Sequence, residues 1–428
     1  MLLILLLLLA VPVLVWALRS RRRARASNHP ADGRPAQGES MAGIPRFTVV
    51  ALGTRGSGKT MLLSSMYHQL QTPTDRSFFL TAPYEQVMLL NQWFTKAADT
   101  DQDWPSGTSV AETRSFTFTV RTRTAAGRVV PVMGLDYLEY AGGLLTDSQE
   151  PGSTRQADLL RQVAQAHALI GIIDGHWLRR WLMEGDPRGR MRLQQSLTSM
   201  ISLMLMATCP VSFVITKWDL LRDLEVDENA RLHQVRKRLM SNPGFRDLVR
   251  VHSTDRVIRL IPVSAVGPDF AELDAEGEIS KLPDGQLEPI GVDIPLSAVV
   301  PDIFAQVEQA MEREHLEAAL DQIRAGTRIG PTAATAELGE YVSRRATRAL
   351  TTLIPGAGFL GDAALAFFDS DSSASIDRRF DLNERLDRTA DEVQDFQQAR
   401  RRVLRDLQSR VDVLEGRLPT SRLSAAED

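Results

Sequence analysis

The chain contains very little cysteine and very little lysine. Cys209 is the single cysteine among 428 residues, so no disulfide can form within the chain and a reducing compartment is indicated. It lies in an apolar run, which is typical of a buried small side chain rather than a reactive thiol. Only five of the 50 basic residues are lysine, and the net charge is −4. Because the chain has no excess of positive charge, nucleic acid is not expected as a partner.

Charge is also missing from the first 18 residues. The apolar run MLLILLLLLAVPVLVWAL approaches the ~20 residues that a transmembrane helix needs, and such helices tolerate proline. Arginines follow at positions 19, 21, 22, 23 and 25, which predicts a cytoplasmic location for everything downstream. A cleaved signal peptide is the alternative, but the run is longer than a signal core and the arginines follow it. We therefore expect a single-pass protein of the cell membrane, anchored by residues 1–26.

Composition divides the rest of the chain into three parts. Residues 27–44 are small, polar and rich in glycine and proline, as in a flexible linker. Residues 45–325 alternate strand-like and helical runs, which predicts an α/β fold. The pattern of residues 326–428 predicts a helical domain with a short coiled-coil-like tail. The expected strands are RFTVVAL, SFTFTVRT, RVVPVMGLDYL, ALIGIID, VSFVIT and IRLIPVS, and helices are expected to begin near Lys59, Asp158, Arg190, Asp227 and Ala298.

The first expected strand leads directly into a phosphate-binding motif. Backbone N–H groups of a glycine-rich loop converge on phosphates, and the N-terminus of the following helix adds positive charge. Lys59 is expected to reach the β- and γ-phosphates, and the Thr60 hydroxyl to coordinate Mg²⁺. The match to G-x-x-x-x-G-K-[ST] is complete and consists of Gly53, Thr54, Arg55, Gly56, Ser57, Gly58, Lys59 and Thr60.

Two later strand ends carry residues that suit a guanine base. Thr216, Lys217 and Asp219 follow the strand VSFVIT. The Asp219 carboxylate can accept hydrogen bonds from guanine N1–H and the 2-amino group together, a pattern that adenine lacks. The Lys217 stem can cover the base plane. After the strand IRLIPVS, a backbone N–H at Ser264 or Ala265 can donate to guanine O6.

These three motifs, in this order and spacing, resemble the guanine-nucleotide motifs of the translation-factor and Ras-like (TRAFAC) class of P-loop GTPases. The resemblance covers about 45–270, and the architecture is similar to bacterial membrane-tethered conflict-system, signalling or double-GTPase-type G domains. It implies a G domain whose sheet is mainly parallel with one antiparallel edge strand, and it implies GTP/GDP and Mg²⁺ as ligands. It also implies two nucleotide-sensing loops, which we place at 97–114 and 139–160.

The resemblance assigns single residues in both loops. Thr108 is the candidate for the threonine that meets Mg²⁺ and senses the γ-phosphate, with Thr113 as the alternative. Glu139 holds the position usually written as aspartate, where a carboxylate meets Mg²⁺ through water, and Gly142 senses the γ-phosphate. Asp136 competes for the metal role. Strand alternation puts it on the opposite face from Glu139, and only Glu139 has the acid-x-x-glycine spacing.

A catalytic group is missing from this pattern. Gly143 stands where a glutamine usually orients water, and no catalytic arginine is identifiable, although Arg55 or an arginine of a partner could serve. We therefore expect a slow GTP-hydrolysing switch that acts on an unidentified effector or regulatory protein. A GTP-binding scaffold without hydrolysis and a dynamin-like membrane remodeller are the alternatives.

Two features of the C-terminal region leave alternatives open. The apolar, glycine-spaced stretch 349–368 fits either a membrane-touching hairpin or a helical hairpin packed in its own domain. A stripe of apolar residues farther on fits either a dimerising coil, and so a homo-oligomer, or a helix packed on its own chain. The stripe consists of Leu404, Leu407, Val411, Leu414 and Leu418.

Overall fold

The computed structural model describes most of the central part of the chain and its last helix. The described ranges are 46–73, 76–106, 113–125, 127–140, 154–254, 256–273, 278–304 and 398–424, without the side chains of 154–156. One compact unit comprises 46–123, 134–312 and 400–428, and a second comprises 1–45, 124–133 and 313–399. Within the described ranges, no helix is long and apolar enough to cross a bilayer. The predicted anchor, 1–26, lies outside them.

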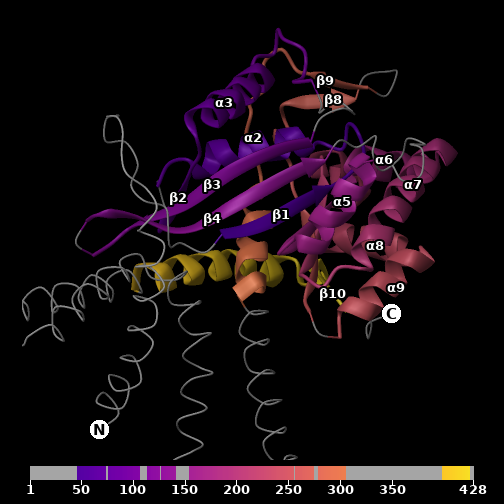
Figure 1. Ribbon diagram of the computed structural model, residues 1–428. Helices are drawn as coiled ribbons and strands as arrows, with labels where there is room; N and C mark the ends of the chain where they lie inside the picture. Colours follow the sequence, from indigo (N-terminus) through magenta and orange to yellow (C-terminus); the bar gives the residue numbers. More distant parts are fainter. Residues whose placement is uncertain are drawn as a thin grey trace, which may run out of the picture. The chain divides into compact units, whose positions relative to one another are not determined.

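An eight-stranded sheet forms the framework of the first unit, in the order β10-β7-β6-β5-β1-β4-β3-β2 (Figure 1). The central strand β1 pairs in parallel with both β4 and β5, and β5, β6 and β7 continue the parallel arrangement. A separate two-stranded sheet joins β8 and β9. The strands are β1 (Arg46–Leu52), β2 (Phe78–Thr81), β3 (Thr113–Arg123), β4 (Val129–Tyr140), β5 (Ala168–Asp174), β6 (Val211–Thr216), β7 (Ile258–Pro262), β8 (Ala271–Leu273), β9 (Ile279–Lys281) and β10 (Arg422–Leu423).

The edges of the sheet correct the prediction of a single antiparallel edge strand. Strand β3 lies next to β4 in the sheet, and β2 adds a further strand that is antiparallel to β3. At the opposite edge, β10 is antiparallel to β7. Four residues form β2 and two form β10, and such short segments carry no readable alternation of apolar and polar residues. Their pairing is set by tertiary contacts.

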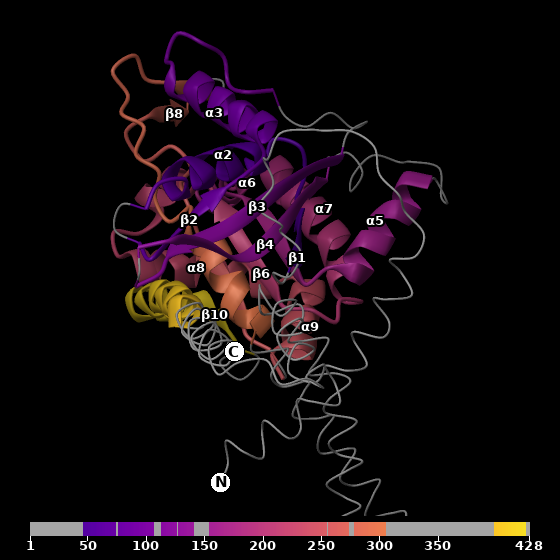
Figure 2. The ribbon, with the colours of Figure 1, turned by 60° about the vertical axis from the view of Figure 1, so that its left-hand side comes forward.

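Helices cover both faces of the sheet. In Figure 2, α5 and α7 lie on one side of the strands and α2 lies on the other. Side-chain oxygens of Asp186, Asp227 and Asn242 cap the helices that follow them. The helices are α2 (Lys59–Leu70), α3 (Tyr84–Ala98), α5 (Thr154–Gln165), α6 (Gly175–Leu182), α7 (Pro187–Met204), α8 (Glu228–Met240), α9 (Pro243–His252), the 3₁₀ helices η2 (Trp218–Leu224) and η3 (Pro419–Ser421), and helical residues 294–304 and 398–417.

The core of this unit lies at its central strands. Every residue of β5 and β6 is buried, as expected for parallel strands covered on both faces. These are the strands that the sequence identifies as continuous apolar runs. Because the C-terminal ends of β1, β5 and β6 meet at one edge, residues that follow these strands are brought together there.

The last helix packs on this unit instead of standing apart from it. Of its apolar stripe, Leu407, Val411, Leu414 and Leu418 are each at most 3 % exposed. The Asp406 carboxylate accepts hydrogen bonds from the backbone N–H and the hydroxyl of Ser77, both shorter than 3 Å. The apolar stripe is therefore used within the chain, as a packed helix requires. Residues 400–428, assigned from the sequence to a helical domain, belong to the same unit as the sheet.

Candidate nucleotide-binding site

The phosphate-binding motif forms a tight loop between β1 and α2. Gly58 adopts φ 84° immediately before the helix, and Gly56 adopts φ 80°, so both occupy the left-handed region that favours glycine. The Gly58 carbonyl accepts the first helical hydrogen bond, from Leu62 N, at 2.8 Å. The first N–H groups of α2 have no partner inside the helix, and they are the groups that can hold an anion.

Lys59 lies folded back under this loop. Its Nζ donates hydrogen bonds to the carbonyl oxygens of Gly53, at 2.8 Å, and Thr54, at 2.9 Å. Burial lowers the pKa of Lys59 to about 8, while the negative charges of Glu139 and Asp174 oppose that shift. The negative charge of a bound phosphate would oppose the effect of burial and stabilise the ammonium form of Lys59.

Thr60 and Glu139 meet beside the loop. The Thr60 hydroxyl donates to Glu139 Oε1 at 3.0 Å, and both residues are buried, with Glu139 only 1 % exposed. Glu139 pairs in register with Ala51, two residues before the loop begins. Asp136 lies farther back along β4, opposite Thr48, where it forms an ion pair with Arg46 at 2.7 Å. The structure therefore brings Glu139, and not Asp136, to the Thr60 hydroxyl.

The end of β6 is tied to the phosphate loop by two side chains. The Thr216 hydroxyl donates to the Ser57 carbonyl oxygen at 2.7 Å. Lys217 Nζ donates to the Gly56 carbonyl oxygen at 2.8 Å. Lys217 also adopts a left-handed backbone conformation, with φ 53°, which is unusual for a residue with a side chain. The loop and the strand end that carries Asp219 are thus held together as one body.

Asp174 is a further residue at this edge, and the sequence analysis did not single it out. It is the last residue of β5 and is 4 % exposed. Its carboxylate oxygens lie 2.9 and 3.0 Å from Lys217 Nζ. It also accepts a hydrogen bond from His176 N at the start of α6. The sequence does carry a signal for this residue. Asp174 is an acidic residue at the end of a strand that is otherwise apolar, and a buried carboxylate needs a cationic partner. Asp174 holds Lys217 against the phosphate loop.

Asp219 and Ser264 are joined by a hydrogen bond. The Ser264 hydroxyl donates to Asp219 Oδ1 at 2.6 Å and accepts from Gly267 N at 2.9 Å. Burial raises the pKa of Asp219, and the hydrogen bond from Ser264 works against that shift. The Ala265 carbonyl oxygen accepts from the Ser65 hydroxyl on α2 at 2.8 Å. The two loops predicted to read the base are therefore in contact with each other and with α2.

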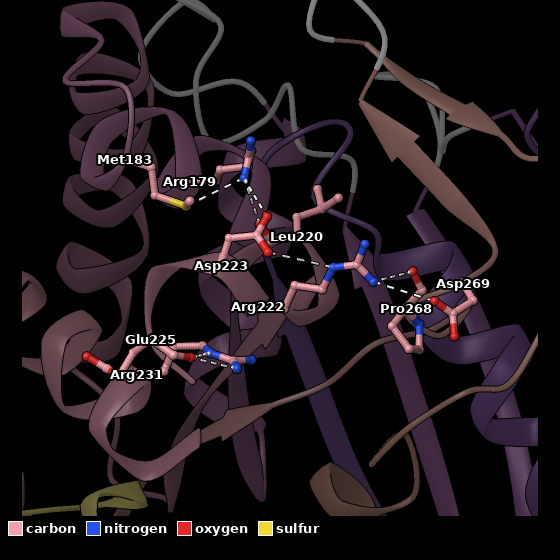
Figure 3. Close-up of polar contacts among 9 residues, drawn as sticks. All are labelled: Arg179, Met183, Leu220, Arg222, Asp223, Glu225, Arg231, Pro268 and Asp269. Carbon is pink, nitrogen blue, oxygen red and sulfur yellow. Dashed lines mark hydrogen bonds and ion pairs between the residues drawn. The ribbon is translucent and has the colours of Figure 1, made fainter. Parts of the chain in front are cut away.

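Charged side chains brace η2, the 3₁₀ helix that begins one residue before Asp219. Figure 3 shows Arg222 between Asp223 and the 268–269 turn, where its Nη1 lies 3.4 Å from the Pro268 carbonyl oxygen. From α6, Arg179 Nη1 donates to the Leu220 carbonyl oxygen at 3.3 Å. These contacts are largely solvent-exposed, so each contributes little stability by itself. They do link η2 to α6 on one side and to the turn after Gly267 on the other.

Two predicted ligands lie outside the described residues. These are Thr108 and Gly142, with their neighbours 107–112 and 141–153. The alternative threonine, Thr113, is the first residue of β3. Among the residues with described positions, no group of three or more His, Cys, Asp and Glu side chains could hold a metal ion. At this edge of the sheet, the Thr60 hydroxyl and the Glu139 carboxylate are two adjacent oxygens that a metal ion could use.

No protein-family model and no curated protein matches the chain. Among solved structures, it is similar to nucleolar GTP-binding protein 1 of Plasmodium falciparum, with 10 % identity, a TM-score of 0.30, and coverage of 66 % of this chain and 98 % of that one. It is also similar to the GTPase-like domain of Saccharomyces cerevisiae Ski7, bound to GDP and inorganic phosphate, with 12 % identity and a TM-score of 0.31. That match covers 64 % of this chain and 51 % of the Ski7 chain.

Proposed function

We propose that this chain is a guanine-nucleotide-binding protein of the P-loop GTPase type, and that it works as a slow GTP-hydrolysing switch at the cell membrane. One observation carries the proposal. Thr216 and Lys217 fasten the end of β6 to the phosphate loop by hydrogen bonds of 2.7 and 2.8 Å, and Asp219 lies two residues after Lys217. A phosphate-binding loop and a carboxylate placed for base recognition are thereby set at a fixed separation.

The choice of base rests on Asp219 and Ser264. The half-buried Asp219 carboxylate accepts one hydrogen bond, from Ser264, and keeps lone pairs for two further donors. Guanine N1–H and its 2-amino group supply two adjacent donors, whereas adenine presents none in that arrangement. Binding of adenine would shield the carboxylate from water and leave its remaining lone pairs without donors, which disfavours the wrong base.

The residues beside the phosphate loop suit Mg²⁺. This ion prefers oxygen ligands, uses one or two protein side chains, and completes its shell with water and phosphate oxygens. The adjacent oxygens of Thr60 and Glu139, 3.0 Å apart, match that donor set. In our proposal Thr60 would ligate the ion and Glu139 would hold it through water. Bound there, Mg²⁺ would neutralise phosphate charge, while Lys59 would neutralise the β- and γ-phosphate oxygens.

We expect slow GTP hydrolysis because of the side chains near the phosphate loop. Arg55 is the one arginine within the phosphate loop, and it is exposed. Gly143 cannot orient an attacking water. We therefore propose that a partner completes the catalytic site, and that the γ-phosphate acts by ordering the two loops around Thr108 and Gly142. The anchor at 1–26 would hold this switch at the cytoplasmic face of the cell membrane.

Substitution of Asp219 by asparagine tests base recognition. Asparagine keeps the shape and can still accept the Ser264 bond, but it presents a neutral amide to the base. Loss of two charge-assisted hydrogen bonds costs about 3–6 kcal/mol, which is roughly 10²- to 10⁴-fold in GDP affinity. The amide N–H₂ would instead donate to the C2 carbonyl of xanthine, so binding of xanthosine diphosphate should rise. Titration calorimetry with GDP, ADP and xanthosine diphosphate measures all three affinities.

Asp223→Asn is the matched control, because Asp223 lies on the same 3₁₀ helix with its side chain 66 % exposed. It should leave all three affinities unchanged. Equal affinity of the wild-type chain for GDP and ADP would contradict the proposed guanine site. Single-turnover hydrolysis of GTP, followed by phosphate release, tests the switch separately. Fast turnover of the purified chain alone contradicts slow hydrolysis, and retention of GTP with no phosphate release favours the scaffold.

A further inference from the structure

In the segment between Ser264 and Ile290, the described residues, 264–273 and 278–290, connect the loop after β7 with the C-terminal end of α3. We name this segment the β8–β9 insert. Its two ends are joined at the loop, because Ser264 N donates to the Ile290 carbonyl oxygen at 3.0 Å and Ile290 N donates back at 2.8 Å. Glu288 N also donates to the Val266 carbonyl oxygen at 2.9 Å. Backbone hydrogen bonds therefore tie the loop after β7 to both ends of the insert.

The far part of the insert holds the end of α3. In both Figure 1 and Figure 2, β8 lies beside α3. Lys281 Nζ donates three hydrogen bonds, to the carbonyl oxygens of Lys96, Asp99 and Gln102, at 2.9, 2.7 and 2.7 Å. An ammonium group has three donors, so all of them are used. A cation here also opposes the negative end of the helix dipole and satisfies carbonyl groups that the helix leaves without partners.

Trp104 adds an aromatic contact to the same junction. Its indole N–H donates to the Ile279 carbonyl oxygen at 2.9 Å. Its ring meets Phe270 edge to face, with centroids 6.0 Å apart, and Lys281 Nζ lies 5.0 Å from the ring centroid. Leu282 N donates to the Phe270 carbonyl oxygen at 2.9 Å, which closes the insert behind these side chains. Lys281, Trp104 and Phe270 therefore form one contact cluster between two distant parts of the sequence.

We propose that the β8–β9 insert couples guanine recognition to the C-terminal end of α3, with Lys281 and Trp104 as the positioning residues. The inference rests on the proposed guanine site. A base that binds Asp219 and the Ser264 loop would restrict the motion of the two ends of the insert, at Ser264 and Ile290. The insert would in turn restrict the motion of residues 96–104. Coupling of this kind needs only that one ligand reduces the motion of a connected segment. The end of α3 thus becomes sensitive to the identity of the base as well as to phosphate.

A second route to α3 has to be separated from this one. The helix that follows the phosphate loop, α2, packs against α3. Inorganic pyrophosphate fills the phosphate loop and offers no base, so it tests the α2 route alone. Guanine coupling through the insert requires that GDP affects the end of α3 and that pyrophosphate does not.

Fluorine NMR of the full-length chain labelled with 5-fluorotryptophan gives the required readout. The chain has six tryptophans, and Trp104→Phe and Trp218→Phe variants assign two of the signals. Trp218 precedes Asp219 directly and reports binding at the base site, whereas Trp104 reports the end of α3. In the wild-type chain, GDP should shift both signals, and ADP or pyrophosphate should leave Trp104 unmoved.

Lys281→Met removes the three donors and keeps the length of the side chain. It should preserve the GDP-induced shift of Trp218 and abolish that of Trp104. Lys237→Met, an exposed lysine on α8, is the matched control and should behave as wild type. If Lys281→Met fails to fold, hydrogen exchange of the wild-type chain decides. GDP at 100 times its Kd should slow exchange of backbone amides in 96–104 by up to ~100-fold, and pyrophosphate should not.

Several results would overturn the inference. These are a Trp104 signal that GDP leaves unmoved while Trp218 shifts, an equal Trp104 shift with pyrophosphate, or a full Trp104 shift in Lys281→Met. A Trp218 signal unmoved by GDP overturns the guanine site itself, and this inference with it. The two failures are therefore distinguishable in one spectrum.

Discussion

Substitution of Gly175 by alanine tests the contact between β6 and the phosphate loop. Gly175 begins α6 directly beside the carbonyl groups of Thr216 and Lys217. A Cβ at this position would lie 2.8 Å from the Lys217 carbonyl oxygen and closer still to that of Thr216, whereas ordinary Cβ contacts begin at 3.4 Å. The two carbonyl groups would have to retreat by at least about 0.6 Å, the difference between those distances. Both contacts are with backbone, so no side chain can rotate away.

The retreat acts on two hydrogen bonds at once. Thr216 and Lys217 contact the phosphate loop at 2.7 and 2.8 Å, and displacement of their backbone lengthens both bonds. One neutral and one charged hydrogen bond contribute about 2–4 kcal/mol together, which corresponds to ~30- to 1,000-fold weaker GDP binding. Overpacking should also lower the free energy of unfolding by about 1–3 kcal/mol.

Titration calorimetry with GDP and urea unfolding measure the two effects of Gly175→Ala. Gly416→Ala is the control, because a Cβ at Gly416 meets nothing within 4 Å and the residue lies inside the last helix. It should raise stability by up to about 1 kcal/mol and leave GDP affinity unchanged. Wild-type GDP affinity in a folded Gly175→Ala variant would refute the claim that these two side chains fix the site.

Two further predictions concern stability. Burial raises the pKa of the Cys209 thiol to about 11 from 9.0, so its contribution to stability should be complete below pH 9 and lost as the pH rises to 11. Cys209→Ala should remove that part of the pH dependence in urea unfolding. Below pH 9 the native thiol should react with a disulfide reagent at least ~100-fold more slowly than the unfolded chain, and equal rates would contradict its burial. Leu407→Ala, at a side chain 1 % exposed, should cost about 2–5 kcal/mol at any protein concentration, whereas Val413→Ala, at 68 %, should stay within ~0.5 kcal/mol. A cost that depends on protein concentration would instead indicate a dimerising coil.

The sequence predicts the central strands and the phosphate loop well. The expected strand RFTVVAL is β1 residue for residue, and ALIGIID and VSFVIT are β5 and β6. Each is a mainly apolar run of six or seven residues, and local sequence is sufficient to specify such elements. Helix starts near Lys59, Arg190 and Asp227 are likewise confirmed within about three residues, because glycine and capping aspartates mark them.

The sequence did not predict elements whose formation depends on residues far away in the chain. More than 150 residues separate β10 from its partner β7 in the sequence. The two residues Arg422–Leu423 carry no pattern that predicts a strand. Helix α3 was missed because it runs into a polar, turn-rich segment that suggested a loop from 97 onward. The role of Asp174 depends on Lys217, which follows a different strand, β6. The insert is recognisable only from the contacts of Lys281 and Trp104, which are 177 positions apart in the sequence.

The packing of the last helix sets an order of events during synthesis. The sheet unit uses Leu407, Val411 and Leu418 as part of its core, yet these residues emerge more than 100 positions after Phe304. At about 5–20 residues per second, the ribosome needs roughly 5–20 s to add 100 residues. During that interval the phosphate loop and both base-reading loops exist on a unit that lacks part of its hydrophobic interior. Full nucleotide affinity should therefore be acquired late, and a nascent chain stalled before residue 400 should retain nucleotide poorly.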